Sequence, residues 1–458
     1  MAMSGMQAAE RVSPMTVLVR GYLERWLNRP VLERLQEQVD SANYERKITL
    51  EAFLAVMLDA VVGMQPSVHA AATARRDQWQ GSLQALYGKL GRVDPLFSSD
   101  LVRQTAAKIT PLIHTLRIQD DWAGRVKVLD GTMPDASENR LGVLRGLKAA
   151  GLPAQCVVVY DRASGICDRV VVDEDAYANE RTLADRILME VEPGEIYVAD
   201  RGFSTSRIMA ELIDHQAFFV IREHRQALVY EEQATPQASG RCSSGATSEG
   251  SVRLYDRFSD RSWTLRRIVL EFDEPTCEGE TELRLLTNLP KNKAASRIAE
   301  LYRDRWTVER HFHLIKRELK GQMPSLGEPR AAIFILCLAL AAGNVLMMLK
   351  ALQRSRGPKD VNPNRTLSGY YVALEISRSY AAIEALTTAR DWQRIAQLSE
   401  AELLKWSRRL ADQIDWTRYL THPRGPKHPP PPRTPRENRR HYSTHRLKQE
   451  AANGNDAC

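Results

Sequence analysis

Residues 125–132 read RVKVLDGT, a short apolar and β-branched run that ends at Asp130 in an Asp-Gly-Thr sequence. Residues 195–203 read EIYVADRGF, a second such run that ends at Asp200. Each run is typical of a buried strand with an acid at its carboxyl end. Taken singly, Asp-Gly and Asp-Arg-Gly are also common turn sequences. Open α/β sheets place their chemistry at such strand ends, so the pair of acids is a candidate site.

The segments around these two strands predict an ordered series of elements. We expect a hairpin around a short Arg-Ala-Ser-Gly turn, then a helix, the second acid-bearing strand, another helix capped by Ser204, and a final strand. The strands of the hairpin span 154–160 and 166–172, and the first helix spans 179–190. The second acid-bearing strand spans 195–200, the second helix spans 204–214 and the final strand spans 217–222. If the strands that carry Asp130 and Asp200 are parallel neighbours, their carboxyl ends lie side by side.

Downstream, residues 301–320 read LYRDRWTVERHFHLIKRELK, which we predict to be one amphipathic helix. At 100° per residue, Tyr302, Arg305, Glu309 and Lys316 fall on one face beside an apolar stripe. A carboxylate flanked by cations suits metal-dependent chemistry on nucleic acid. The alternative is an ordinary surface helix with charge pairs four residues apart.

These three motifs resemble the signatures of the bacterial insertion-sequence-four transposases, which are DDE enzymes with a ribonuclease-H-like core. The resemblance runs over roughly residues 120–350, and it includes LLTNLP at residues 285–290. It implies an α/β fold, in which a ribonuclease-H-like mixed sheet is flanked by helices and accompanied by a β-strand insertion and a helical N-terminal domain. The order of the predicted elements agrees with such a core.

By that resemblance, Asp130, Asp200 and Glu309 would be the metal-binding and catalytic triad. Carboxylate oxygens are the ligands that Mg²⁺ prefers, and two such ions (or Mn²⁺ in their place) are expected. Tyr302, Arg305 and Lys316 would contact phosphates of the transposon end, and Arg201 is a further candidate for contact with DNA.

The activity that the resemblance implies is cut-and-paste transposition, in which transposon ends are cleaved and then joined to target DNA, in some relatives through a hairpin. A homodimer on paired terminal inverted repeats is implied by the family. Two alternatives stay open: a metal-dependent nuclease of the same fold that does not join strands, and an inactive DNA-binding regulator.

The predicted division of the chain has six parts. We expect a helical N-terminal domain, a catalytic core in two parts around a β-rich insertion, a helical C-terminal region and a basic, proline-rich disordered tail. The N-terminal domain spans 1–120, the two parts of the core span 121–222 and 291–355, and the insertion between them spans 223–290. The C-terminal region spans 356–422, and the tail spans 423–458. The N-terminal domain is either an end-recognition module or a plain helical bundle, because no tight helix-turn-helix signature is present.

Within the insertion, residues 236–251 are rich in Ser and Gly and predict a flexible loop, whereas residues 252–258 and 263–270 predict strands of a small sheet. The resembled family uses this insertion to contact the cleaved end. Trp263 is therefore a candidate for stacking on a displaced base, and its alternative is a Trp packed within the sheet.

The formal net charge of the 458-residue chain is +7. Residues 423–449 contain eight Lys or Arg and one acid, so the rest of the chain sums to about zero. A core that binds DNA must then use local patches. The tail either holds DNA without sequence preference or serves solubility.

The six cysteines are scattered and include no C-x-x-C pair, which is typical of a reduced, cytoplasmic protein. We expect no membrane association and a place at the bacterial nucleoid. Residues 331–349 (AAIFILCLALAAGNVLMML) are long enough for a membrane span, but we interpret them as the central helix of a soluble core.

Overall fold

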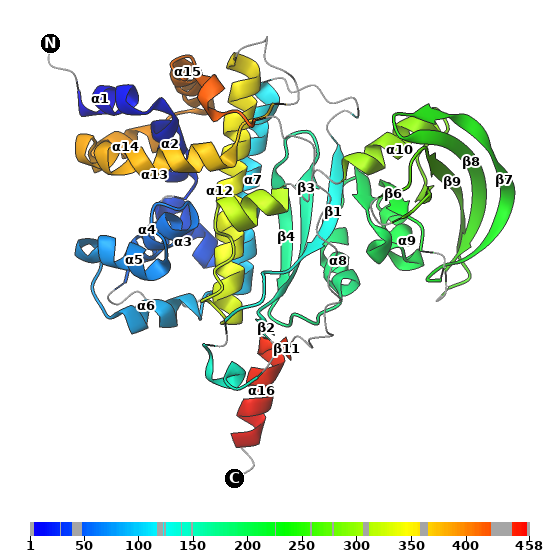
Figure 1. Ribbon diagram of the computed structural model, residues 1–458, viewed down its shortest axis with the longest axis horizontal. Coiled ribbons are helices and arrows are strands. Elements are labelled where there is room, and N and C mark those ends of the chain that lie inside the picture. The colour runs from blue at the N-terminus through cyan, green and yellow to red at the C-terminus, as the bar shows by residue number, and fades with distance from the viewer. Residues whose placement is uncertain are drawn as a thin grey trace.

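The computed structural model describes residues 4–27, 29–38, 48–116, 122, 125–138, 140–147, 150–224, 226–256, 259–276, 279–305, 311–357, 365–422 and 442–455. Helices gather on one side, a sheet begins beside them, and a strongly curved group of strands forms the other side (Figure 1). One long helix, α12 (Pro329–Arg356), stands between the helices and the sheet.

The N-terminal region is helical, as predicted. Its helices are α1 (Gly5–Val12), α2 (Pro14–Trp26), α3 (Arg29–Gln38), α4 (Leu50–Val61), α5 (Val68–Ala74), α6 (Leu83–Leu90) and α7 (Pro95–Thr115). Polar side chains begin most of them. The N-cap Thr49 of α4, for example, accepts a hydrogen bond from the backbone N–H of Ala52 at 3.2 Å.

Among the described residues, nine strands form one mixed sheet in the order β4-β3-β1-β5-β6-β10-β9-β8-β7. The predicted hairpin is present as two antiparallel strands, and the two acid-bearing strands are parallel neighbours. The mixed α/β architecture of a ribonuclease-H-like fold is thus confirmed. The core elements are β1 (Val126–Thr132), β3 (Gln155–Asp161), β4 (Cys167–Asp173), α8 (Glu180–Leu188), β5 (Ile196–Ala199), α9 (Ser206–Asp214) and β6 (Phe218–Arg222). Thr205, and not Ser204, caps α9.

The insertion corrects two predictions. The segment 236–251, predicted to be a flexible loop, lies in a long hairpin, and the predicted small sheet is instead a continuation of the core sheet. The strands are β7 (Val229–Cys242), β8 (Gly245–Tyr255), β9 (Ser262–Phe272) and β10 (Glu282–Thr287). Most of β7 is exposed on both faces, so it needs no apolar alternation, and backbone pairing with β8 holds it in the sheet.

The apolar segment 331–349 lies within α12. Among the helices of the described residues, α12 alone is long and apolar enough to cross a membrane. Its apolar window is nevertheless wholly buried in the protein. α12 contacts α7 along its length, and it also contacts α2, α4 and β4. This burial agrees with the prediction of a central core helix.

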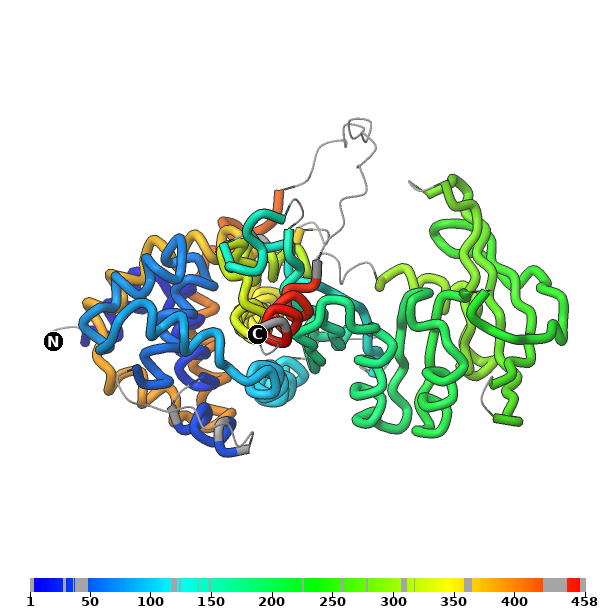
Figure 2. Tube along the Cα trace, turned by 90° about the horizontal axis from the view of Figure 1, so that it is seen from below, coloured from blue at the N-terminus to red at the C-terminus, as the bar shows by residue number. Residues whose placement is uncertain are grey.

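The C-terminal helices pack on the N-terminal ones. α13 (Gly369–Leu386) contacts α1 and α2, while α14 (Ala389–Ala396) and α15 (Glu400–Ala411) also contact α2. Figure 2 shows the N-terminal helices, in blue, beside the helices α13 to α15, in orange, in one helical body. The C-terminal region 356–422 was predicted to be helical, and these helices are present. They pack on the N-terminal helices, and α15 also contacts α12 of the core.

The last part of the tail is folded, which corrects the prediction of disorder over 423–458. β11 (Tyr442–Ser443) pairs in parallel with β2 (Gly151–Leu152), and α16 (Thr444–Asn455) follows it. Asp175 accepts hydrogen bonds from Ser443 Oγ at 2.6 Å and from Arg446 Nε at 2.7 Å. The proline-rich composition gave no sign of these contacts with a distant part of the chain. Residues 423–441 lie outside the described residues.

Replacing Asp175 with alanine should loosen this C-terminal helix. The side chain joins β11 and α16 to the core by two hydrogen bonds, whereas the strand pairing, the ion pair of Lys448 with Glu328 and the contacts of α16 with residues 142–144 remain. We expect faster tryptic cleavage after Arg446 and Lys448, measured by mass spectrometry. Glu211→Ala, on exposed α9 surface, is the control, and equal cleavage rates in the two variants would contradict the anchoring role.

Candidate functional site

Asp130 and Asp200 lie side by side at the carboxyl ends of paired strands. β1 and β5 are parallel, with Leu129 opposite Ala199. The residues that follow these two, Asp130 and Asp200, are therefore neighbours. β1 was predicted to end at Asp130, but it continues to Thr132 because β3 still pairs with it there. The sheet thus holds Asp130 rigidly, while Asp200 stands at the start of a turn.

Backbone N–H groups orient both carboxylates. Asp130 Oδ1 accepts from the N–H of Gly131 at 3.0 Å, and Asp200 Oδ1 accepts from the N–H of Gly202 at 2.8 Å. The second bond makes Asp200 the cap of the short 3₁₀ turn Arg201–Phe203. Each acid therefore has one oxygen engaged by its own loop.

The electrostatic setting of Asp130 favours a nearby cation. Burial raises the pKa of Asp130 to about 6, the Arg305 guanidinium opposes this rise, and the negative charges of Asp200 and Glu180 add to it. Arg305 Nη1 lies 2.9 Å from Asp130 Oδ2. One cation thus only partly offsets the burial and the neighbouring carboxylates.

The signature segment is not one regular α-helix, contrary to the prediction for 301–320. α10 (Ala295–Asp304) ends just before Arg305, residues 311–313 are helical, and Leu314–Glu318 forms a π-helix. Glu309 falls in 306–310, outside the described residues. The predicted convergence of Glu309 with the two aspartates therefore stays a prediction.

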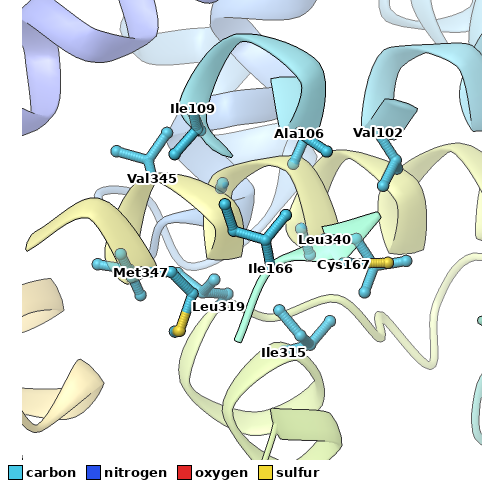
Figure 3. Packing of buried hydrophobic residues seen from close by; sticks show 14 of the residues in the cluster. Val102, Ala106, Ile109, Ile166, Cys167, Ile315, Leu319, Leu340, Val345 and Met347 are labelled. Carbon is cyan, nitrogen blue, oxygen red and sulfur yellow. The ribbon is translucent and has the colours of Figure 1, made fainter. Parts of the chain in front are cut away.

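Packing against α12 accompanies the π-helix. The N–H of Leu319 donates to the carbonyl of Leu314 at 3.0 Å, a spacing of five residues. Ile315 sits directly on Gly343 of α12, where an added Cβ would lie 2.4 Å from Ile315 Cδ1. Figure 3 shows Ile315 and Leu319 facing the α12 surface. Ile315 and Leu319 of the apolar stripe are thus buried as expected, although the turns that carry them are wider.

The three other residues of the helix motif reach the same edge of the sheet. Tyr302 is 4 % exposed, and the Arg305 guanidinium carbon lies 5.7 Å from the centre of its ring. Burial acts to lower the pKa of Arg305, but Tyr302, Asp130 and Asp200 outweigh it and raise that pKa. Lys316 Nζ donates to the carbonyl of Met133 at 2.7 Å, just beyond the end of β1.

The two remaining candidates differ in position. Arg201 is exposed and directly follows Asp200. Trp263 is half-buried, with the Arg261 guanidinium carbon 4.9 Å from its ring centre. The strand register places Trp263 toward the amino ends of the parallel strands, since β9 pairs Arg266 with Thr287, which in turn pairs with Val220. The structure therefore does not bring Trp263 to the aspartates.

A further acid, Glu180, lies at this edge and was not singled out from the sequence. It begins α8, directly after the N-cap Asn179. An added Cβ at Gly131 would lie 2.2 Å from Glu180 Oε1, so the carboxylate touches the glycine that follows Asp130. An acid in the first turn of a helix is so common that its position in the sequence carries no special signal.

The oxygen-rich donor set suits a hard divalent cation in kind. The Arg305 guanidinium offsets part of the negative charge of the buried carboxylates, and such an ion would neutralise the rest. Within the described ranges, which exclude Glu309, no three Asp, Glu, His or Cys side chains converge closely enough to hold one metal ion. Binding would therefore require the side chains to draw closer together.

Comparison with known proteins points to one family. Residues 144–343 match the family model described as the transposase DDE domain, a range that includes Asp200 and Glu309 and begins after Asp130. The chain is similar to the protein named "Putative transposase y4zB" of Sinorhizobium fredii, with 30% identity over 184 residues. The alignment covers 39% of this chain and 46% of that relative, so the chain spans less than half of the relative's length.

Proposed function

We propose that this chain, which belongs to the DDE transposase family, is a cut-and-paste DNA transposase with Asp130, Asp200 and Glu309 as its catalytic, metal-binding triad. The observation that carries the proposal is the parallel pairing of β1 with β5, with Asp130 and Asp200 next to each other at its end. The bacterial insertion-sequence-four subgroup, implied by the motifs, is part of the same proposal.

The residues of this edge have distinct tasks. Asp130 and Asp200 would hold Mg²⁺ (or Mn²⁺), in a two-ion site with Glu309. When bound, such ions activate an attacking oxygen and stabilise the leaving one. The N–H groups of Gly131 and Gly202 fix the direction of the two carboxylates. Because no covalent bond to the protein is required, positioning and charge are what the chain supplies.

Arg305 is suited to a change of partner. Its guanidinium is paired with the Asp130 carboxylate in this structure. When a divalent cation neutralises that carboxylate, Arg305 would instead bind a phosphate of the transposon end. Tyr302 lies against its guanidinium and limits its directions. Lys316 and the exposed Arg201 would add phosphate contacts on either side of the aspartates.

The proposed reaction has two kinds of step. Water first breaks a phosphodiester at the 3′ end of the element and frees a 3′-hydroxyl. That hydroxyl then attacks a phosphodiester of target DNA, or of the opposite strand when a hairpin is formed, and displaces a hydroxyl of the attacked strand. Two ends must be processed, so we propose a homodimer on paired terminal inverted repeats, acting at the bacterial nucleoid.

One reaction tests this proposal against its alternatives. Purified protein is incubated with Mg²⁺, the genomic ends that flank its gene and a plasmid target. Cut ends that become covalently joined to the plasmid are the expected result. Cutting without joining indicates a nuclease of the same fold, and binding without cutting indicates a regulator. Either outcome would overturn the proposed transposase activity.

Lys316→Ala should weaken the binding of transposon ends and lower its dependence on salt. Loss of one phosphate contact reduces the slope of log K against log salt by about 0.9. Binding is measured by fluorescence anisotropy at several salt concentrations. Lys405→Ala, on the exposed surface of α15, is the matched control. A slope for Lys316→Ala equal to that of the control would exclude the phosphate contact.

A further inference from the structure

We propose that Glu180 is a fourth carboxylate of the divalent-cation site, beside Asp130 and Asp200. The inference rests on the proposed function and adds a metal-binding residue that the triad does not include. It is carried by the contact of Glu180 with Gly131 and by a buried amide that holds Glu180 in place.

Gly131 provides the space for this approach. Its Cα is so close to Glu180 that a Cβ would lie 2.2 Å from Oε1 and 2.5 Å from Cδ. Real Cβ atoms do not come so near to other heavy atoms, so any larger residue after Asp130 would push Glu180 away. The glycine of the Asp-Gly-Thr motif therefore lets Glu180 approach the backbone that directly follows Asp130.

A buried amide beside Glu180 carries an oxygen suited to a cation. Gln155 is 3 % exposed, and its Nε2 donates to Glu180 Oε1 at 2.7 Å. Its Oε1, buried from solvent, accepts no hydrogen bond from any described residue. An unpaired buried carbonyl oxygen costs free energy unless a donor or cation reaches it. Next to a carboxylate that is already engaged, a hard cation satisfies both groups.

The start of α8 is tied to both aspartate loops. Asn179 caps the helix, and Arg181 Nε donates to the carbonyl of Gly202, in the turn after Asp200, at 2.7 Å. Glu180 stands between these two residues and against the loop of Asp130. It is therefore fixed relative to both acids by the backbone.

The charges of the acids interact. Burial raises the pKa of Glu180, the Gln155 hydrogen bond opposes that rise, and the charge of Asp200 adds to it. Glu180 in turn raises the pKa of Asp130. A divalent cation that draws Asp130, Asp200 and Glu180 together would neutralise their charges.

The test is Mn²⁺ binding to the full-length protein without DNA, followed by electron paramagnetic resonance of the free ion. Glu180→Gln preserves the size of the side chain and an oxygen acceptor for Gln155, but it removes the charge. We expect a loss of affinity of about 10- to 100-fold, the range found when groups that support a metal are changed. Glu211→Gln, on exposed α9 surface, should bind Mn²⁺ as the unmodified protein does.

Two further variants separate the possible outcomes. Asp200→Asn should abolish tight Mn²⁺ binding. If it does and Glu180→Gln binds normally, the role of Glu180 is overturned while the proposed site stands. If Asp200→Asn itself binds normally, the proposed metal site is overturned. If Glu180→Gln fails to fold, Glu180→Asp is measured instead, since its shorter side chain withdraws the carboxylate from the site. Unchanged Mn²⁺ affinity in that variant would equally overturn the inference.

Discussion

Replacing Asp200 with asparagine is expected to lower Mg²⁺-dependent cleavage of transposon ends by at least about 10³-fold, because metal coordination supplies several kcal/mol of transition-state stabilisation. Asparagine can still accept the Gly202 N–H bond that shapes the turn, so the fold should persist. Binding of the ends should be retained, since phosphate contacts come from cations elsewhere. Cleavage is followed on labelled ends, and binding by anisotropy.

Asp130→Asn and Glu309→Gln should behave in the same way. A suitable control is Asp185→Asn, which changes an acid of α8 that pairs with Arg207 at 3.0 Å, away from the strand ends. Cleavage at the unmodified rate by any of the three variants would remove that residue from the triad. Loss of binding along with cleavage would instead point to a defect of folding.

The second large effect concerns stability, and it arises from a buried ion pair in the helical body. Arg75 Nε and Nη2 bond both oxygens of Asp59 at 2.6 and 2.9 Å, with the two residues 8 % and 5 % exposed. Arg75→Ala would leave Asp59 buried without its cation. We expect a loss of about 3–5 kcal/mol in the free energy of unfolding, measured by urea denaturation.

The dependence on pH provides a specific signature. Burial already raises the pKa of Asp59, and removing Arg75 removes the two largest interactions that oppose this rise, so that only the weaker opposition of the Arg20 charge remains. A carboxyl whose pKa is higher in the folded state binds more protons there, so it disfavours folding as the pH rises. The destabilisation of Arg75→Ala should therefore be large at neutral pH and diminish as the pH falls.

Two controls complete this experiment. Arg418→Ala breaks an exposed pair with Asp415 and should lower the free energy of unfolding far less than Arg75→Ala does. The double variant Asp59→Leu/Arg75→Met removes both charges and should recover much of the lost stability. A loss for Arg75→Ala no larger than that for Arg418→Ala would show that solvent reaches Asp59.

The parts of the fold that were predictable have strong local signals. Strands were predicted from the apolar runs before Asp130 and Asp200 and from the turn between β3 and β4. These strands pair as expected, β1 with β5 in parallel and β3 with β4 in antiparallel. The position of the two aspartates followed directly, because parallel neighbours bring equivalent ends together.

Other parts depend on contacts that no local pattern encodes. The side-chain spacing of residues 301–320 gives no sign that Ile315 must fit against Gly343, where the backbone has π-helical turns. The exposed strand β7 has the composition of a loop, because neither face needs apolar residues. Glu180 escaped notice for a similar reason, since only the close approach of Gly131 gives it a role.

The packing of α13, α14 and α15 on the N-terminal helices has a consequence for synthesis on the ribosome. α2 packs on α13, α14 and α15, and Arg75 also donates to the hydroxyl of Tyr380. The first helices to emerge must therefore wait for most of the polypeptide before their partners exist. A nascent or prematurely terminated product exposes apolar surface that chaperones and proteases recognise, so incomplete copies should be short-lived in the cell.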